Sequence, residues 1–76
     1  MAEHEFDAGT RGCNEGLART FREQLSAVPP GDTLRFVVSD PVARVEIPAL
    51  ARLLGHRVLS VAEDGDRITI TVEATP

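Results

Sequence analysis

The single cysteine of the chain, Cys13, lies in the stretch RGCNEG, just before a segment with helical spacing. The thiolate is the nucleophilic form of cysteine, and the free N–H groups at the start of a helix lower the pKa of a thiol placed there. We expect Gly12 and Gly16 to leave the sulfur uncrowded. Arg11 adds positive charge nearby, whereas Glu15 is a like charge beside a thiolate. A thiolate in this position would be a reactive nucleophile at neutral pH.

A buried, inert Cys13 is the alternative, because free cysteines are among the most buried residues of proteins. The polar and glycine neighbours favour exposure and leave both interpretations open. The arginines Arg11, Arg19 and Arg22 predict a small positive patch beside the cysteine. This patch is either a solvated helix face or a surface that docks an acidic partner.

Length and composition narrow the classes of function. With 76 residues we expect one domain over residues 1–76, frayed at residues 1–5 and 74–76. The net charge is −4 and the aromatic residues are three phenylalanines, which argues against direct nucleic-acid binding. One cysteine forms no internal disulfide, and the apolar runs are only a few residues long. We therefore expect a cytoplasmic protein with a reduced thiol, no secretory signal and no membrane insertion.

Other candidate groups predict no further chemistry. His4 and His56 are too few and too far apart in the sequence to indicate a metal site. Asp7 and Asp40 suit turn and cap positions better than catalysis. No phosphate-binding glycine loop, paired-cysteine metal motif or Ser/His/Asp arrangement is present, so we expect no cofactor and no metal.

Two helices are expected to position the cysteine. The first spans residues 14–28, with an apolar face of Leu17, Phe21, Leu25 and Val28. The second spans residues 41–54, with its apolar stripe at Ala43, Ile47, Leu50 and Leu54. Asp40 is predicted as its N-cap and Gly55 as its C′ residue. Pro48 interrupts this second pattern and predicts a kink or a restart near Ile47.

Four strands are expected at residues 6–10, 33–39, 56–63 and 67–73, with a hairpin turn at residues 64–66. In the last strand Ile68, Ile70 and Val72 alternate with polar residues, which indicates a sheet with one packed and one wet face. In the second strand Leu34, Phe36 and Val38 take one face and Val37 the other. The order β-α-β-α-β-β predicts an α+β fold. It is a two-layer α/β sandwich, with two helices packed on one face of a four-stranded mixed sheet.

The chain resembles the TusA/SirA-like family of small sulfur carriers over residues 6 to about 73. The family opening, hydrophobic-Asp-Ala followed by Cys-Pro-x-Pro, corresponds to FDAGTRGCNEG, with Asp7, Ala8 and Cys13 in place. The segments PGDTL (30–34), DPVARVEIP (40–48) and Gly-His (55–56) match later family motifs. Both prolines of the cysteine motif are absent, with Asn14 and Gly16 in their places.

The resemblance implies a sulfur-relay function for Cys13. The family cysteine accepts sulfane sulfur from a donor such as a cysteine desulfurase or a rhodanese-like protein. It holds that sulfur as a persulfide and passes it to an acceptor protein. We therefore expect a component of a sulfurtransferase system, and we expect it to be a monomer. Asn14 could cap the first helix in place of the missing proline, with Gly12 and Gly16 shaping the site. The alternative is a non-catalytic regulatory or interaction module of the same fold.

Overall fold

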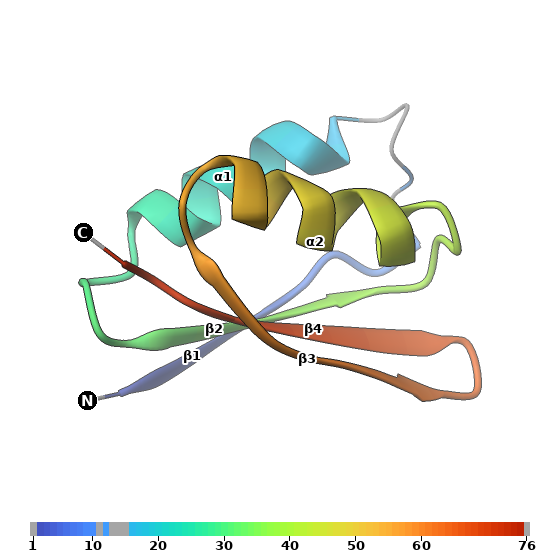
Figure 1. Ribbon diagram of the computed structural model, residues 1–76. Coiled ribbons are helices and arrows are strands. Elements are labelled where there is room, and N and C mark those ends of the chain that lie inside the picture. The colour runs from blue at the N-terminus through green and yellow to red at the C-terminus, as the bar shows by residue number, and fades with distance from the viewer. Residues whose placement is uncertain (1, 11, 13–15, 76) are drawn as a thin grey trace.

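The fold consists of two helices lying on one face of a four-stranded sheet (Figure 1). The computed structural model describes residues 2–10, 12 and 16–75. Its elements are β1 (Glu3–Asp7), α1 (Leu17–Ser26), β2 (Thr33–Val38), α2 (Ala43–Leu53), β3 (Arg57–Asp64) and β4 (Arg67–Glu73). The strand order is β1-β2-β4-β3, with β1 parallel to β2 and the other pairs antiparallel. The predicted α+β two-layer fold and its element order are confirmed.

The core lies between the helices and the sheet, and the alternation in β4 predicts it correctly. Ile68, Ile70 and Val72 are buried there against the helices. All three phenylalanines of the chain meet in this layer. The ring of Phe36 on β2 stacks on Phe6 at 5.7 Å between centroids and meets the edge of Phe21 at 5.1 Å. Phe36 thus joins β1, β2 and α1.

Helix α1 is shorter than the predicted range 14–28. Its N-cap residue Gly16 has φ 80°, in the left-handed region, so a right-handed helix cannot run through it from Asn14. At the other end the helix stops at Ser26, since Val28 precedes Pro29 and the α conformation is disfavoured before proline. Val28 is nevertheless buried, as its place in the apolar pattern predicts.

The N-cap residue of α2 is Val42 rather than the predicted Asp40, and Asp40 caps the turn that precedes the helix. The side chain of Asp40 accepts a hydrogen bond from the N–H of Val42 at 2.9 Å, and its carbonyl accepts one from Ala43 at 3.1 Å. The regular helix begins at Ala43 rather than at Pro41. It then continues across Pro48, whose ring is buried, so the predicted restart near Ile47 is wrong. Packing of the proline against the core offsets its missing N–H donor.

The apolar stripe of α2 differs at one position from the predicted one. Ala43 and Ile47 are buried and Leu50 is half-buried, but Leu54 is 41% exposed and Ala51 is fully buried instead. Leu54 is the C-cap residue, where the chain leaves the helix and turns toward β3. The chain direction at the helix end, rather than helical periodicity, therefore decides the exposure of Leu54.

Gly55 ends α2 as predicted, with φ 88°. Its N–H donates to the carbonyl of Arg52 at 3.0 Å, and the N–H of His56 donates to the carbonyl of Ala51 at 2.9 Å. This pair of bonds is the Schellman arrangement, which needs a left-handed residue at this position.

The Gly55→Ala variant is expected to lose about 1 kcal/mol of unfolding free energy. A Cβ at this position meets no atom within 4 Å, so backbone strain is the whole cost. Gly55→Asn should lose less, because asparagine tolerates the left-handed region better. Urea denaturation measures both values. Equal losses for the two variants would show that the left-handed conformation is not what the position requires.

Described residues near both termini form hydrogen bonds with distant segments of the chain. Residues 1–5 were expected to fray, yet Glu3 pairs in register with Thr33 and His4 with Leu34. Ala74 and Thr75, in the range 74–76 that is expected to fray, also have such partners. Ala74 is buried and exchanges backbone hydrogen bonds with residues 31 and 32, and the N–H of Thr75 donates to Nδ1 of His56 at 3.1 Å. Partners distant in the sequence supply these bonds, so no local pattern predicts them.

Asp32 ties the N-terminal segment to the start of β2. Its carboxylate accepts a hydrogen bond from His4 Nε2 at 3.0 Å and one from the N–H of Ala2 at 3.0 Å. The bond from His4 and then the bond from Ala2 lower the pKa of Asp32 below 3.8. Because the folded pKa is depressed, this stabilisation is present above pH 3.8 and is lost as the pH falls through the folded value.

The Asp32→Asn variant is expected to be less stable than the wild type at neutral pH, because an amide accepts weaker hydrogen bonds than a carboxylate. The difference in unfolding free energy should shrink as the pH falls below 3.8, where the wild-type carboxylate becomes protonated. Urea denaturation of both proteins across this range measures it. A difference that stays constant down to about pH 2 would contradict a role for the ionised carboxylate.

Candidate functional site

The predicted nucleophile belongs to the connection between β1 and α1. Cys13, Arg11 and Asn14 lie outside the described residues, so their roles stay predictions. Gly12 is half-buried and Gly16 is exposed. The structure therefore defines the two borders of the predicted site rather than its centre.

The β1 border of this connection is fixed by three hydrogen bonds to its surroundings. Asp7 accepts a bond from the N–H of Gly9 at 2.8 Å, which confirms the predicted turn role of this aspartate. The N–H of Ala8 donates to the carbonyl of Val37, and the hydroxyl of Ser39 donates to the carbonyl of Gly9, both at 2.8 Å. Ser39 was not predicted as a site residue. Its partner is 30 positions away, so no short motif indicates it.

The α1 border is a helix start at which no described side chain forms a cap. Gly16 offers no capping atom, and no acidic residue lies in the first turn of the helix. The first turn of a helix carries partial positive charge on its backbone N–H groups. Both helices begin at the end of the molecule where β1 and β2 terminate (Figure 1). The electrostatics at this border favour a negatively charged group such as a thiolate or persulfide.

Arg19 and Arg22 lie three positions apart on α1, both exposed, as the predicted positive patch requires. They line a groove of about 650 Å³ between α1 and the C-terminal end of α2, termed here the α1–α2 groove. Its lining residues are Ala18, Arg19, Arg22, Glu23, Leu25, Ser26, Leu50, Leu54 and His56. The contributions of α2 and His56 were not predicted, because they depend on how the two helices pack.

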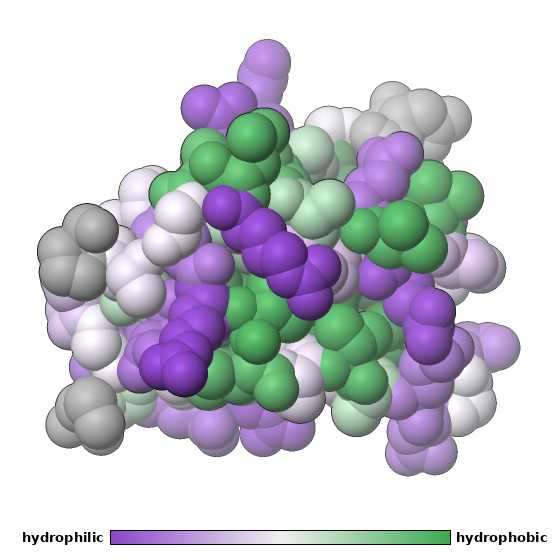
Figure 2. Space-filling model, viewed as in Figure 1, coloured by the Kyte–Doolittle hydropathy of each residue, from purple (hydrophilic) through white to green (hydrophobic). Residues whose placement is uncertain are grey.

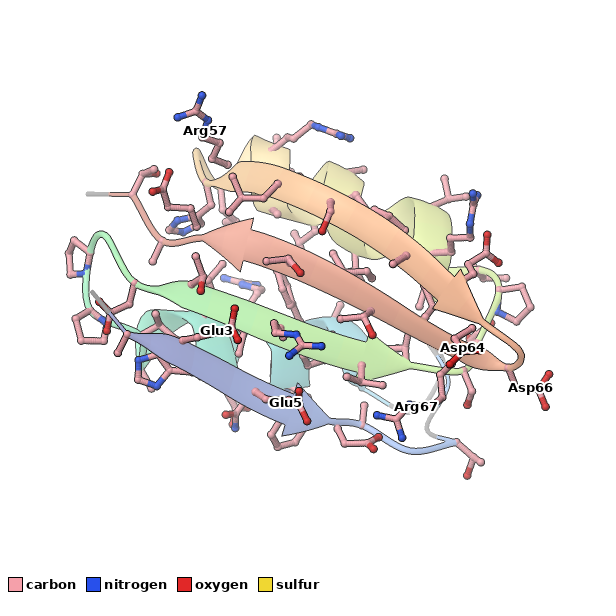
Figure 3. The ribbon with its side chains drawn as sticks, turned by 90° about the horizontal axis from the view of Figure 1, so that it is seen from below. Glu3, Glu5, Arg57, Asp64, Asp66 and Arg67 are labelled. Atoms are coloured by element: carbon pink, nitrogen blue, oxygen red, sulfur yellow. The ribbon has the colours of Figure 1, made fainter. Side chains whose placement is uncertain are left out.

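The uncovered face of the sheet carries a different arrangement of charge (Figure 3). There the arginines are neutralised by acids on neighbouring strands. Arg35 contacts Glu3 and Glu5, each at 3.6 Å, and Arg57 contacts Glu73 at 3.9 Å. This face therefore offers no free basic surface for a nucleic-acid backbone.

An ion pair on the same face helps to explain why Val37 is buried. Arg67 on β4 reaches Asp7 on β1 at 3.7 Å and so spans β2, which lies between these strands. Val37 was predicted on the wet face, yet it is only 2% exposed. Its neighbours in register are Asp7 and Thr69, so flanking strands and the ion pair shield it from water.

The histidines have structural partners: His4 binds Asp32 and His56 binds the N–H of Thr75. Within the ranges 2–10, 12 and 16–75, no group of three or more His, Cys, Asp or Glu side chains could hold a metal ion. Over the same ranges, neither helix has the length and apolar character needed to cross a membrane.

Comparison with known protein families matches residues 13–74 to the family described as sulfurtransferase TusA. The matched range begins at Cys13 and covers every element from α1 to β4. A search of curated proteins found no match to the chain.

Proposed function

The chain belongs to the TusA sulfurtransferase family, whose members act as sulfur carriers, and on that premise we propose that Cys13 is its carrier residue. In this proposal Cys13 accepts sulfane sulfur as a persulfide and relays it to a partner protein. The observation that carries the proposal is that the family match starts at the only thiol of the chain. Every sulfur relayed by thiol exchange must therefore pass through this residue.

The proposed step is an exchange between sulfur atoms without net oxidation. The Cys13 thiolate attacks the outer sulfur of a persulfide on the donor protein. The S–S bond of the donor breaks, the donor cysteine leaves as a thiolate, and a new S–S bond forms on Cys13. In the second exchange, a thiolate of the acceptor protein attacks the outer sulfur on Cys13. The Cys13 thiolate then leaves, and the sulfur is bound to the acceptor. The step needs a thiolate and access for two partner proteins in turn.

Two features of the described structure support this chemistry. Within the described residues, the first turn of α1 contains no acidic side chain, so the positive end of this helix favours both the thiolate and the persulfide anion. The bonds of Ala8 and Gly9 to β2 and Ser39 fasten the other border to the sheet.

Arg11, Arg19 and Arg22 are the proposed docking residues for the partners. The proposed donor is a cysteine desulfurase or a rhodanese-like protein, and the acceptor is a second sulfur-handling protein. The proposed location is the cytoplasm and the proposed state is a monomer. Of these arginines, Arg19 and Arg22 are exposed on one helix and have no ion-pair partner within the described part of the chain.

The experiment is persulfide loading with a cysteine desulfurase, free cysteine and a persulfide-selective label. The wild-type chain is expected to gain the label and Cys13→Ser to gain none. An established carrier of the same family serves as the positive control. If that carrier is loaded and this chain is not, the proposal fails.

An interaction module without sulfur chemistry is the second candidate, and one observation favours it. Gly16 stands where the family motif has its second proline, and its φ of 80° is inaccessible to proline, whose ring holds φ near −65°. The backbone at this border therefore differs from the one that the family motif specifies. The loading experiment separates the two candidates, because a module would remain unlabelled.

A further inference from the structure

We propose that the α1–α2 groove binds an acidic segment of a partner protein that inserts one bulky apolar side chain. The inference rests on the proposed function in one respect: the partner is taken to be the donor or acceptor of the sulfur relay. It adds the chemistry of the contact, which the carrier role does not specify.

The interior of the groove is apolar. Leu25 of α1 is 2% exposed, Leu50 of α2 is half-buried, and Leu54 at the end of α2 is 41% exposed. The groove volume of about 650 Å³ lies within the usual range for specific binding sites and accommodates a leucine or phenylalanine side chain with its adjoining backbone. Covering Leu54 would remove apolar surface from water, which favours binding.

The charge at the groove selects an acidic segment. Among the arginines that the structure describes, Arg35, Arg44, Arg57 and Arg67 each contact a carboxylate within 4.0 Å. Arg19 and Arg22 have no such contact with any described carboxylate, and among the described residues Glu23 alone adds an acidic side chain to the groove lining. In a chain of net charge −4, the groove is thus a local site of attraction for carboxylates.

Further apolar side chains are exposed on α2 outside the groove. Leu53, next to the groove residue Leu54, is 83% exposed, and Val45 on the same helix is 66% exposed. Figure 2 shows apolar residues interleaved with charged side chains on this side of the molecule. The groove combines an apolar interior with two arginines, Arg19 and Arg22, that have no ion pair among the described residues, and this combination is the reason to assign the partner segment there.

The test uses synthetic peptides as probes and heteronuclear NMR of the isotope-labelled chain. The first peptide has aspartate and glutamate residues around a central leucine. The second replaces this leucine by glycine, and the third keeps the leucine but has lysines in place of the acids. At millimolar concentration the first peptide is expected to shift the amide signals of Ala18, Arg22, Leu50, Leu54 and His56. The other two peptides should produce clearly weaker shifts.

Variants of the chain identify the contributing side chains. Arg22→Ala and Leu54→Ala should each lower the affinity for the first peptide about two- to fivefold. Changes of this size are expected on removal of a solvent-exposed ion pair or a partly buried leucine. Arg52→Ala is the matched control, because Arg52 is an exposed arginine outside the groove without an ion pair among the described residues. Its affinity should equal that of the wild type.

Three results would overturn the proposal: no shifts at the groove, equal binding of the lysine peptide, or an equal effect of Arg52→Ala and Arg22→Ala. The Cys13→Ser variant should bind the first peptide normally, since the groove residues lie on α1, α2 and His56. Failure of the sulfur relay with intact peptide binding therefore refutes the carrier role alone. Intact sulfur relay without peptide binding refutes only the proposal that the groove binds a partner segment.

Discussion

Replacing Phe36 by alanine is expected to lower the free energy of unfolding by about 3–5 kcal/mol, the usual cost of removing a buried phenylalanine. Phe36 is fully buried and contacts the rings of both other phenylalanines, Phe6 and Phe21. A chain of 76 residues has a total stability of about 4–11 kcal/mol, from about 0.05–0.15 kcal/mol per residue. The variant is therefore expected to be largely unfolded or close to it.

Circular dichroism during urea denaturation measures this loss. Leu53→Ala is the control, because Leu53 is 83% exposed and its truncation should change the stability by no more than about 0.5 kcal/mol. If the Phe36 variant cannot be purified folded, Phe36→Leu provides a milder change in the same direction. A loss below about 1 kcal/mol for Phe36→Ala would show that the phenylalanine cluster does not hold the helices to the sheet.

Cys13→Ser is expected to abolish sulfur relay from a donor to an acceptor protein completely. The hydroxyl group of serine cannot form a persulfide, and the chain has no second thiol that could take over. Transfer of labelled sulfur from a cysteine desulfurase to an acceptor, with the carrier in limiting amount, measures the effect. Residual relay at the wild-type rate would exclude Cys13 as the carrier and favour the interaction module.

The same position tests whether the sulfur has a structural role. Cys13→Ala should leave the unfolding free energy nearly unchanged if the thiol is exposed, as the carrier role requires. A loss above about 2 kcal/mol would instead indicate a buried thiol packed in the core. This measurement shows whether the loss of relay in Cys13→Ser comes from missing chemistry or from a damaged fold.

The strands and helices with strong periodicity could be predicted from the sequence. In β4 the apolar residues at alternate positions are all buried. Successive side chains of a strand point to opposite faces of the sheet, so alternating apolar residues all lie on the packed face. The C-terminal end of α2 was predictable too, since Gly55 acts through bonds within a few residues of the chain. Local chemistry of this kind is what a sequence displays directly.

Features that depend on distant segments could not be predicted. Strand β1 begins at Glu3 because β2 pairs with it, and Ser39 holds Gly9 from 30 positions away. Helix α1 begins at Leu17 rather than at residue 14 because Gly16 has a left-handed conformation. Glycine can adopt this conformation but also many others, so its presence in the sequence does not predict it. The α1–α2 groove likewise depends on the packing of two helices, although Arg19 and Arg22 were identified beforehand.

The central claim, that Cys13 carries sulfane sulfur, is tested most directly by mass spectrometry of the chain after incubation with a cysteine desulfurase and cysteine. The predicted result is a gain of one sulfur atom that maps to Cys13, disappears on treatment with a thiol reductant and is passed on when an acceptor protein is added. An unchanged mass, under conditions that load another carrier of the family, would contradict the claim.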